Sequence, residues 1–331
     1  MRSRSRIALA ATALLALAGA ATNLPTTPIH AAFSGSSSNP STGLASAPDW
    51  VAPSASATVI AKDPLGYIPG FVRPSGSYRA YAQESDTGNP ASGTATVTGD
   101  LTALTVGQSA AALAAGAFSV GGVSYNRRGA ALSVAAGTTA GAKAYSLTLT
   151  DSASPANART QTGFTVTVDN VVPSATDVQT ANKAGGIAGK AEIDDTMTLT
   201  FSEEIEPYSV LANWTGASTN VVVRLNNNIA GDRVQVWNAA NTAQLPLGQV
   251  VLGDTGFTTA NRTFGATGTA STMTKSGAVI TLVLGTASGA TGTETGTSTL
   301  AWTPSATATD PAGNATSTTA RNETGAADLE F

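Results

Sequence analysis

Short stretches in which apolar and polar residues alternate occupy most of the chain from about residue 58 onward. In the stretch 144–150, Tyr145, Leu147 and Leu149 alternate with polar neighbours, and the stretch 163–169 repeats this pattern. Successive side chains of a strand point to opposite faces, so a period of two is typical of a strand with one buried face. The pattern therefore predicts many short strands, each with one face in a core.

Turn-forming residues separate these stretches. The segment 151–157, DSASPAN, has the composition of a hairpin loop. The Asn-rich segment 226–231 predicts a second hairpin between strands at 220–225 and 232–237. Further strands are expected at 77–84, 197–201, 247–252, 278–284 and 299–302. For the Ala-rich segment 109–117 we predict a helical turn.

Many short strands and no long amphipathic helical pattern favour an all-β fold of β-sandwich domains. We place a domain boundary at the segment 169–173, DNVVP, because proline cannot donate to a central ladder and suits a linker or an edge. The sequence thus predicts two tandem sandwiches, at 57–170 and 171–331. The Ser-, Pro- and Gly-rich segment 33–56 before them is predicted to be a flexible linker.

Residues 1–32 have the features of an export signal. Three arginines precede an almost uncharged run, rich in Ala and Leu, at 7–21, and cleavage is expected after Ala20 or near Ala31 or Ala32. That run is too short to cross a hydrocarbon core of about 30 Å comfortably, although an uncleaved N-terminal membrane anchor is the alternative. No later segment resembles a transmembrane helix, so we expect a secreted protein, either free or associated with the cell surface.

Composition narrows the classes of function. Charged residues make up 11% of the chain, against about 25% in typical soluble domains, and the net charge is −4. The chain has no basic surface pattern outside the leader, which argues against nucleic-acid binding. It contains no cysteine, and its one histidine, His30, lies in the predicted leader. A mature chain without these residues lacks the commonest general base, thiol nucleophile and transition-metal ligands, so we expect no enzyme.

The segment 197–210, MTLTFSEEIEPYSV, ends its alternation in three carboxylates, Glu203, Glu204 and Glu206. We interpret these as solvated side chains at the rim of a sandwich, where acidic loops are common. Pro207 can open a tight turn or a single helical turn. In the alternative hydrolase hypothesis, Glu203 or Glu204 is the acid or base, which requires a second carboxylate about 5–10 Å away.

A calcium site is a further hypothesis for these acids. Calcium takes oxygen ligands that converge from several loops, and the candidates are Glu203, Glu204, Asp310 and Asn314. The segment 310–314, DPAGN, also has a plain structural explanation, since Asp, Pro and Gly at these positions form a tight turn. No other cofactor is expected.

Two tryptophans suggest a ligand site. Trp214 and Trp237 flank predicted strands and could form a platform for a sugar ring. The alternative is that both lie in the core, because a sandwich of this size needs large inward residues.

Three segments resemble bacterial Ig-like domains of cell-surface and exported proteins. They are DNVVPS at 169–174, TLTFSEEI at 198–205 and SATATDPAGNA at 305–315. The resemblance covers 169–331 well and 48–168 loosely, through VAPS at 51–54 and the exit TVTVDN. The segment AAFSGSSSNP, at 31–40, is also similar to the processing region of exported matrix or fibre-type proteins.

This resemblance implies secretion, Ig-like sandwiches and a role in surface architecture, adhesion or spacing, and it implies no catalytic residue. We therefore expect a non-catalytic secreted or cell-surface structural or adhesion protein. Its expected partners are other surface proteins, copies of itself or cell-wall glycans. The alternative hypothesis is an extracellular carbohydrate- or ligand-binding module.

Overall fold

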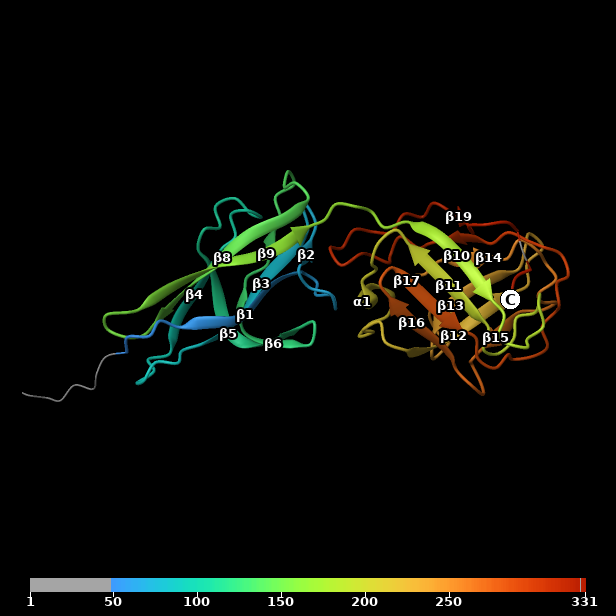
Figure 1. Cartoon of the computed structure of the whole chain (residues 1–331), viewed down its shortest axis with the longest axis horizontal. Coiled ribbons are helices and arrows are strands. Elements are labelled where there is room, and N and C mark those ends of the chain that lie inside the picture. The colour runs from blue at the N-terminus through green and yellow to red at the C-terminus, as the bar shows by residue number, and fades with distance from the viewer. Residues whose placement is uncertain (1–48, 328) are drawn as a thin grey trace, which may run out of the picture. The chain divides into compact units, whose positions relative to one another are not determined.

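The computed structural model describes residues 49–327 and 329–331, in which nearly all regular structure is β-strand (Figure 1). The predicted export signal, its cleavage sites and the linker up to residue 48 lie outside the described residues. All described residues belong to one structural unit, and their strands form two sheets. We call β1–β9 the first module and β10–β19 the second module. The predicted all-β fold with two domains is confirmed, and the two sheets pack as sandwich or barrel-like domains.

The first module, coloured blue to green in Figure 1, is a nine-stranded sheet in the order β1-β3-β6-β5-β4-β8-β9-β2, with β7 paired to β3. Its strands are β1 (Ser54–Lys62), β2 (Phe71–Val72), β3 (Ser77–Ser85), β4 (Thr94–Asp100), β5 (Ala111–Val120), β6 (Val123–Gly129), β7 (Leu132–Ser133), β8 (Gly141–Asp151) and β9 (Ala158–Val168). The pairing is antiparallel except between β2 and β9. β1 begins at Ser54, inside the predicted linker.

The alternation in β8 places its apolar side chains in the core. Tyr145, Leu147 and Leu149 are each at most 5% exposed. Burying a large apolar side chain stabilises the fold by about 1.5–3 kcal/mol, so the alternating positions hold the strand in register. β8 and β9 pair as the predicted hairpin across 151–157.

The prediction of a helical turn at 109–117 is wrong. Most of this segment belongs to β5, which pairs with β6 through Gly121 and Gly122, both with positive φ. Two glycines in this conformation suit a tight hairpin turn. Pairing with β6 and burial of Leu113 override the helix preference of alanine, which is only a weak local tendency.

The second module, coloured yellow-green to red, is a ten-stranded sheet in the order β10-β11-β17-β16-β12-β13-β14-β18-β19, with β15 paired to β12 (Figure 1). Its elements are β10 (Ala175–Ala181), β11 (Thr196–Phe201), α1 (Pro207–Val210), β12 (Thr219–Asn226), β13 (Arg233–Asn238), β14 (Gln249–Val251), β15 (Arg262–Phe264), β16 (Ser271–Ser276), β17 (Val279–Val283), β18 (Ala301–Thr303) and β19 (Arg321–Asn322). The predicted hairpin around 226–231 joins β12 to β13.

The core of the second module is built around two large aromatic residues. Phe201 and Trp302 meet edge to face, with 4.7 Å between their ring centroids. The Trp302 indole is fully buried and donates to the Leu247 carbonyl at 2.8 Å. The edge-to-face contact contributes about 0.5–1.5 kcal/mol beyond the burial of area. The rings therefore tie β11 to β18 across the core.

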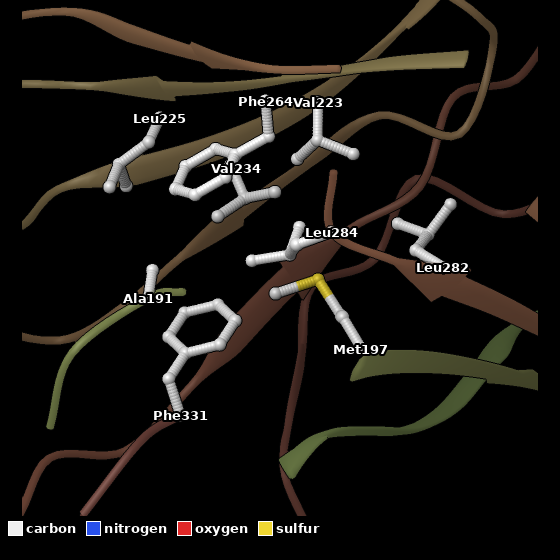
Figure 2. Close-up of a pocket in the computed structure, with 9 residues that line it drawn as sticks. All are labelled: Ala191, Met197, Val223, Leu225, Val234, Phe264, Leu282, Leu284 and Phe331. Carbon is white, nitrogen blue, oxygen red and sulfur yellow. The ribbon is translucent and has the colours of Figure 1, made fainter. Parts of the chain in front are cut away.

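A small internal cavity of about 10 Å³ lies in the same core, lined entirely by apolar residues such as Met197, Phe264 and Phe331 (Figure 2). It has room for about one water molecule, but a buried water needs polar partners. We therefore interpret the cavity as imperfect packing and not as a ligand site.

Residues 49–327 and 329–331 contain no helix with the length and apolar character that a membrane span requires.

Candidate metal centre

Three carboxylates converge where the second module begins. Asp169 directly follows β9, Glu203 lies just after β11, and Asp310 lies in the loop after β18. One oxygen of each lies within 4.8 Å of the others. Three separate segments, far apart in the sequence, thus bring oxygen ligands to one point.

The turn 310–314 holds Asp310 in place. Its Oδ1 accepts the backbone N–H groups of Gly313 at 2.6 Å and Asn314 at 2.7 Å, and its Oδ2 accepts the Asn314 side-chain amide at 2.7 Å. Gly313 has a φ of 96°, a conformation that favours glycine. This is the turn that the sequence predicted. Asp310 is fully buried, and burial raises its pKa above the usual value despite these hydrogen bonds.

Asp169 is fixed by contacts on its backbone and its side chain. Its N–H donates to the Val72 carbonyl at 2.8 Å, and its own carbonyl accepts the Asn314 amide at 3.1 Å. Its carboxylate Oδ1 accepts the Val171 N–H at 2.9 Å. The first residue after β9 is thereby attached to the turn that carries Asp310.

Glu203 lacks such support. Its Oε1 is buried and has no hydrogen-bond partner among the described residues. Burial is the main cause that raises its pKa to about 7, and the nearby charges of Asp169 and Asp310 add to the shift. An ionised carboxylate in this position needs a positive charge, because buried charges are stable only when paired or bound to a metal.

A lysine beside the cluster pairs mainly with a carboxylate outside it. Lys62 Nζ contacts the Glu206 carboxylate at 3.4 Å and the Asp310 backbone carbonyl at 3.1 Å. Burial lowers the pKa of Lys62, although Glu206 opposes this shift. Glu206 is therefore the main electrostatic partner of the lysine, and Asp310 is a weaker one.

The donor set fits a hard cation. Carboxylate oxygens are the ligands that calcium and magnesium prefer, and calcium takes about 6–8 oxygens at about 2.3–2.6 Å. Asp169, Glu203 and Asp310 would supply carboxylate ligands, and backbone carbonyls or water would complete the shell. The absence of nitrogen and sulfur ligands in the cluster disfavours zinc and copper.

Sequence reasoning named part of this cluster. It named Glu203 and Asp310 but missed Asp169, whose only signal was its position at the predicted domain boundary. Glu204 points elsewhere, since its side chain is 45% exposed and forms a salt bridge with Lys275. Asn314 takes part through its amide nitrogen, which bridges Asp169 and Asp310 and so positions the ligands.

The interpretation of Glu206 as a solvated rim residue is wrong. It is 1% exposed, and its carboxylate accepts the backbone N–H groups of Tyr67 at 2.7 Å and Ile68 at 3.2 Å. It also caps α1 by accepting the N–H of Tyr208. These donors, together with Lys62, replace water around the buried charge, which local sequence could not indicate.

The two candidate tryptophans do not form an open platform. Trp214 is 4% exposed in the core and donates to the Ala217 carbonyl at 2.6 Å. Trp237 lies partly exposed on β13, and the guanidinium carbon of Arg224 sits 3.4 Å from its ring centroid. A cation–π contact of this kind occupies the ring face that a sugar would need.

Comparison with protein-family models, curated proteins and solved structures gave no match.

Proposed function

We propose that this chain is a non-catalytic structural or adhesion protein, secreted or attached to the cell surface, whose linker between modules is tightened by calcium. The observation that carries the proposal is the meeting of Asp169, Glu203 and Asp310 at that linker, with a buried Glu203 oxygen left without a hydrogen bond. The predicted export signal and the resemblance to bacterial Ig-like domains support the extracellular location.

A cation at this point would act mechanically. It would bind Asp169, which begins the segment between the modules, to Glu203 and Asp310, which belong to the second module. Part of the order in that segment would then depend on calcium, which suits a protein that must stay extended or stiff outside the cell. Low charge and Thr-rich strands support association with other surface molecules or with copies of the chain.

Thermal unfolding of the full chain tests the calcium site. At calcium about a hundredfold above its dissociation constant, the stability gain is about 2.7 kcal/mol. For a module of this size that corresponds to a rise of about 5–10 °C in melting temperature over the same protein in EGTA. Glu203→Gln, with calcium binding weakened about tenfold or more, should cut this rise to about half or less, whereas Glu204→Gln, the matched control outside the cluster, should retain it in full. Equal melting temperatures with and without calcium in the wild type would contradict the calcium site.

The structural or adhesive role has its own test. Fractionation of producing cells, with N-terminal sequencing of the mature chain, should find it in the medium or the wall, cleaved near one of the two predicted sites. Sedimentation at high concentration and binding to whole cells should then reveal self-association or attachment. A chain that stays inside the cell, or that is monomeric and binds no cells, would contradict the role.

Binding of a neutral glycan is the second candidate. A shallow hollow of about 510 Å³ on the second module is lined by uncharged hydrogen-bonding side chains, among them Gln235, Gln244, Gln249 and Thr303. Such groups match sugar hydroxyls, although aromatic stacking would not contribute while Arg224 covers Trp237. A glycan array with the full chain separates this candidate from a purely structural role.

A further inference from the structure

The first module begins with the same motif as the second. The segments DWVAPS at 49–54 and DNVVPS at 169–174 share Asp, Val, Pro and Ser at matching positions. In each, the Asp side chain accepts a backbone N–H two residues later. Val51 donates to Asp49 and Val171 donates to Asp169, both at 2.9 Å.

A second part of the arrangement is also repeated. In the second module, the Asn314 amide bridges the Asp310 carboxylate and the Asp169 carbonyl, at 2.7 and 3.1 Å. In the first module, the Asn157 amide bridges the Asp151 carboxylate at 2.7 Å and the Asp49 carbonyl at 2.8 Å. The turn between β8 and β9 therefore corresponds to the turn 310–314.

Strand pairing supplies the third correspondence. Ser54 pairs in register with Ser85 at the end of β3. Ser174 exchanges hydrogen bonds with Ser202 after the end of β11. The residue that follows Ser85 or Ser202 in the sequence is acidic, Asp86 in the first module and Glu203 in the second.

The two modules thus carry equivalent sets of acids. Asp49, Asp86 and Asp151 correspond to Asp169, Glu203 and Asp310. The motif matches the first pair, the strand pairing the second, and the asparagine amide bridge the third, so together the three observations define the correspondence. We call each set the acidic corner of its module.

The two corners differ in the hydrogen-bond donors that lie against their carboxylates. In the first module Ser92 lies between two acids, and its hydroxyl donates to Asp49 Oδ2 at 2.8 Å and contacts Asp86 Oδ2 at 3.4 Å. The Ser92 N–H lies 2.9 Å from Asp49 and 3.1 Å from Asp86. The N–H groups of Gly88 and Gly93 also donate to Asp86. Gly88 passes so close to the Asp49 carboxylate that a side chain there would collide with it.

The loop 86–93 makes this difference possible. It follows β3 and folds its donors back over the acids, whereas the chain after β11 enters α1 directly and brings no donor to Glu203 Oε1. Hydrogen bonds, first that from Val51, keep the pKa of Asp49 below its usual value. Burial raises the pKa of Glu203, so the pKa values of Asp49 and Glu203 shift in opposite directions. The first corner is therefore satisfied by the chain itself.

We infer that Ser92 and the loop 86–93 hold the acids of the first corner together, as a divalent cation does in the second corner. Each chain then binds one cation, at Asp169, Glu203 and Asp310. The first corner stays closed without calcium. The part of the inference that concerns the second corner rests on the proposed calcium site. The part that concerns the first corner, its closure by Ser92, is independent of calcium. Of the two corners, only the one at the linker then responds to calcium concentration.

Calorimetric titration with calcium chloride tests the inference. It compares the full wild-type chain with one variant in each corner, at the corresponding residues Asp86 and Glu203. The wild type should bind one calcium ion. Asp86→Asn should keep that number and an affinity within about twofold of the wild type, whereas Glu203→Gln should weaken binding about tenfold or more. Two calcium ions in the wild type, with one lost in Asp86→Asn, would overturn the inference.

Ser92→Ala separates the inference from the proposed function. In EGTA it should lower the melting temperature of the first module by about 3 °C or more, because the buried Asp49 and the half-buried Asp86 lose a shared donor. Tryptophan fluorescence, which reports mainly the second module through Trp214, Trp237 and Trp302, should be unchanged by this variant at the same temperatures. If the wild type binds no calcium while Ser92→Ala still destabilises the first module, only the proposed calcium site fails. A Ser92→Ala variant as stable as the wild type would overturn the inference.

Discussion

Asp310→Asn is expected to destabilise the second module both with and without calcium. The Asp310 side chain is fully buried and uses both carboxylate oxygens within its own turn. Asparagine can keep one oxygen for the backbone N–H groups of Gly313 and Asn314. Its amide nitrogen then faces the Asn314 amide, which is also a donor. The substitution therefore replaces one hydrogen bond with two opposed donors.

The expected loss follows from those contacts. A hydrogen bond to a charged acceptor contributes about 1.5–3 kcal/mol, and a buried donor left without a partner costs about 1–3 kcal/mol. The free energy of unfolding should therefore fall by about 3 kcal/mol or more. At about 2–4 °C per kcal/mol for a module of this size, the melting temperature should fall by about 6 °C or more.

Differential scanning calorimetry in EGTA measures this loss without any contribution from calcium. Glu203→Gln should be at least as stable as the wild type there, because Glu203 Oε1 has no hydrogen bond to lose and glutamine carries no buried charge. Glu204→Gln, at an exposed salt bridge, should change stability by no more than about 1 kcal/mol. If Asp310→Asn melted within about 1 °C of the wild type in EGTA, the hydrogen-bonded turn would not be what holds the corner together.

Two further predictions concern pH and the core. In EGTA the second module should lose stability as pH rises from about 4.5 to about 7, because burial raises the folded-state pKa of Glu203 from 4.5 to about 7 and the folded chain keeps its proton longer than the unfolded chain. Thermal unfolding of Glu203→Gln over the same range should show a flatter profile, and a profile identical to that of the wild type would contradict the shift. Trp302→Phe should cost about 1–3 kcal/mol in urea unfolding, because the buried Leu247 carbonyl loses its donor. Trp237→Phe should cost about 1 kcal/mol or less, since its Nε1 has no partner to lose and phenylalanine keeps a ring face for Arg224.

The strands and turns could be predicted because their causes are local. Alternation in β8 and β11, and turn residues at 151–157, 226–231 and 310–314, act over a few neighbouring residues. Prediction failed at β5, where alanine and glycine have no alternating pattern and pairing with β6 decides the conformation. The prediction for Glu206 also failed, because most hydrogen-bond donors to its buried carboxylate come from residues 62–68, which are distant in the sequence.

The sequence by itself determined an all-β chain in two modules, a low content of charged residues, and a chain without cysteine whose one histidine, His30, lies in the predicted leader. Only the tertiary structure decided which acids meet. Asp169, Glu203 and Asp310 have no common sequence pattern. The pairing of β10 with β11 and the hydrogen bond from Asn314 to the Asp169 carbonyl bring their loops together. Likewise, the sequence shows two similar Asp-x-Val-x-Pro-Ser motifs, but only folding places Ser92 against one corner and leaves a Glu203 oxygen without a donor at the other. Strand formation depends on near neighbours, whereas the charge balance of a corner depends on every segment that packs against it.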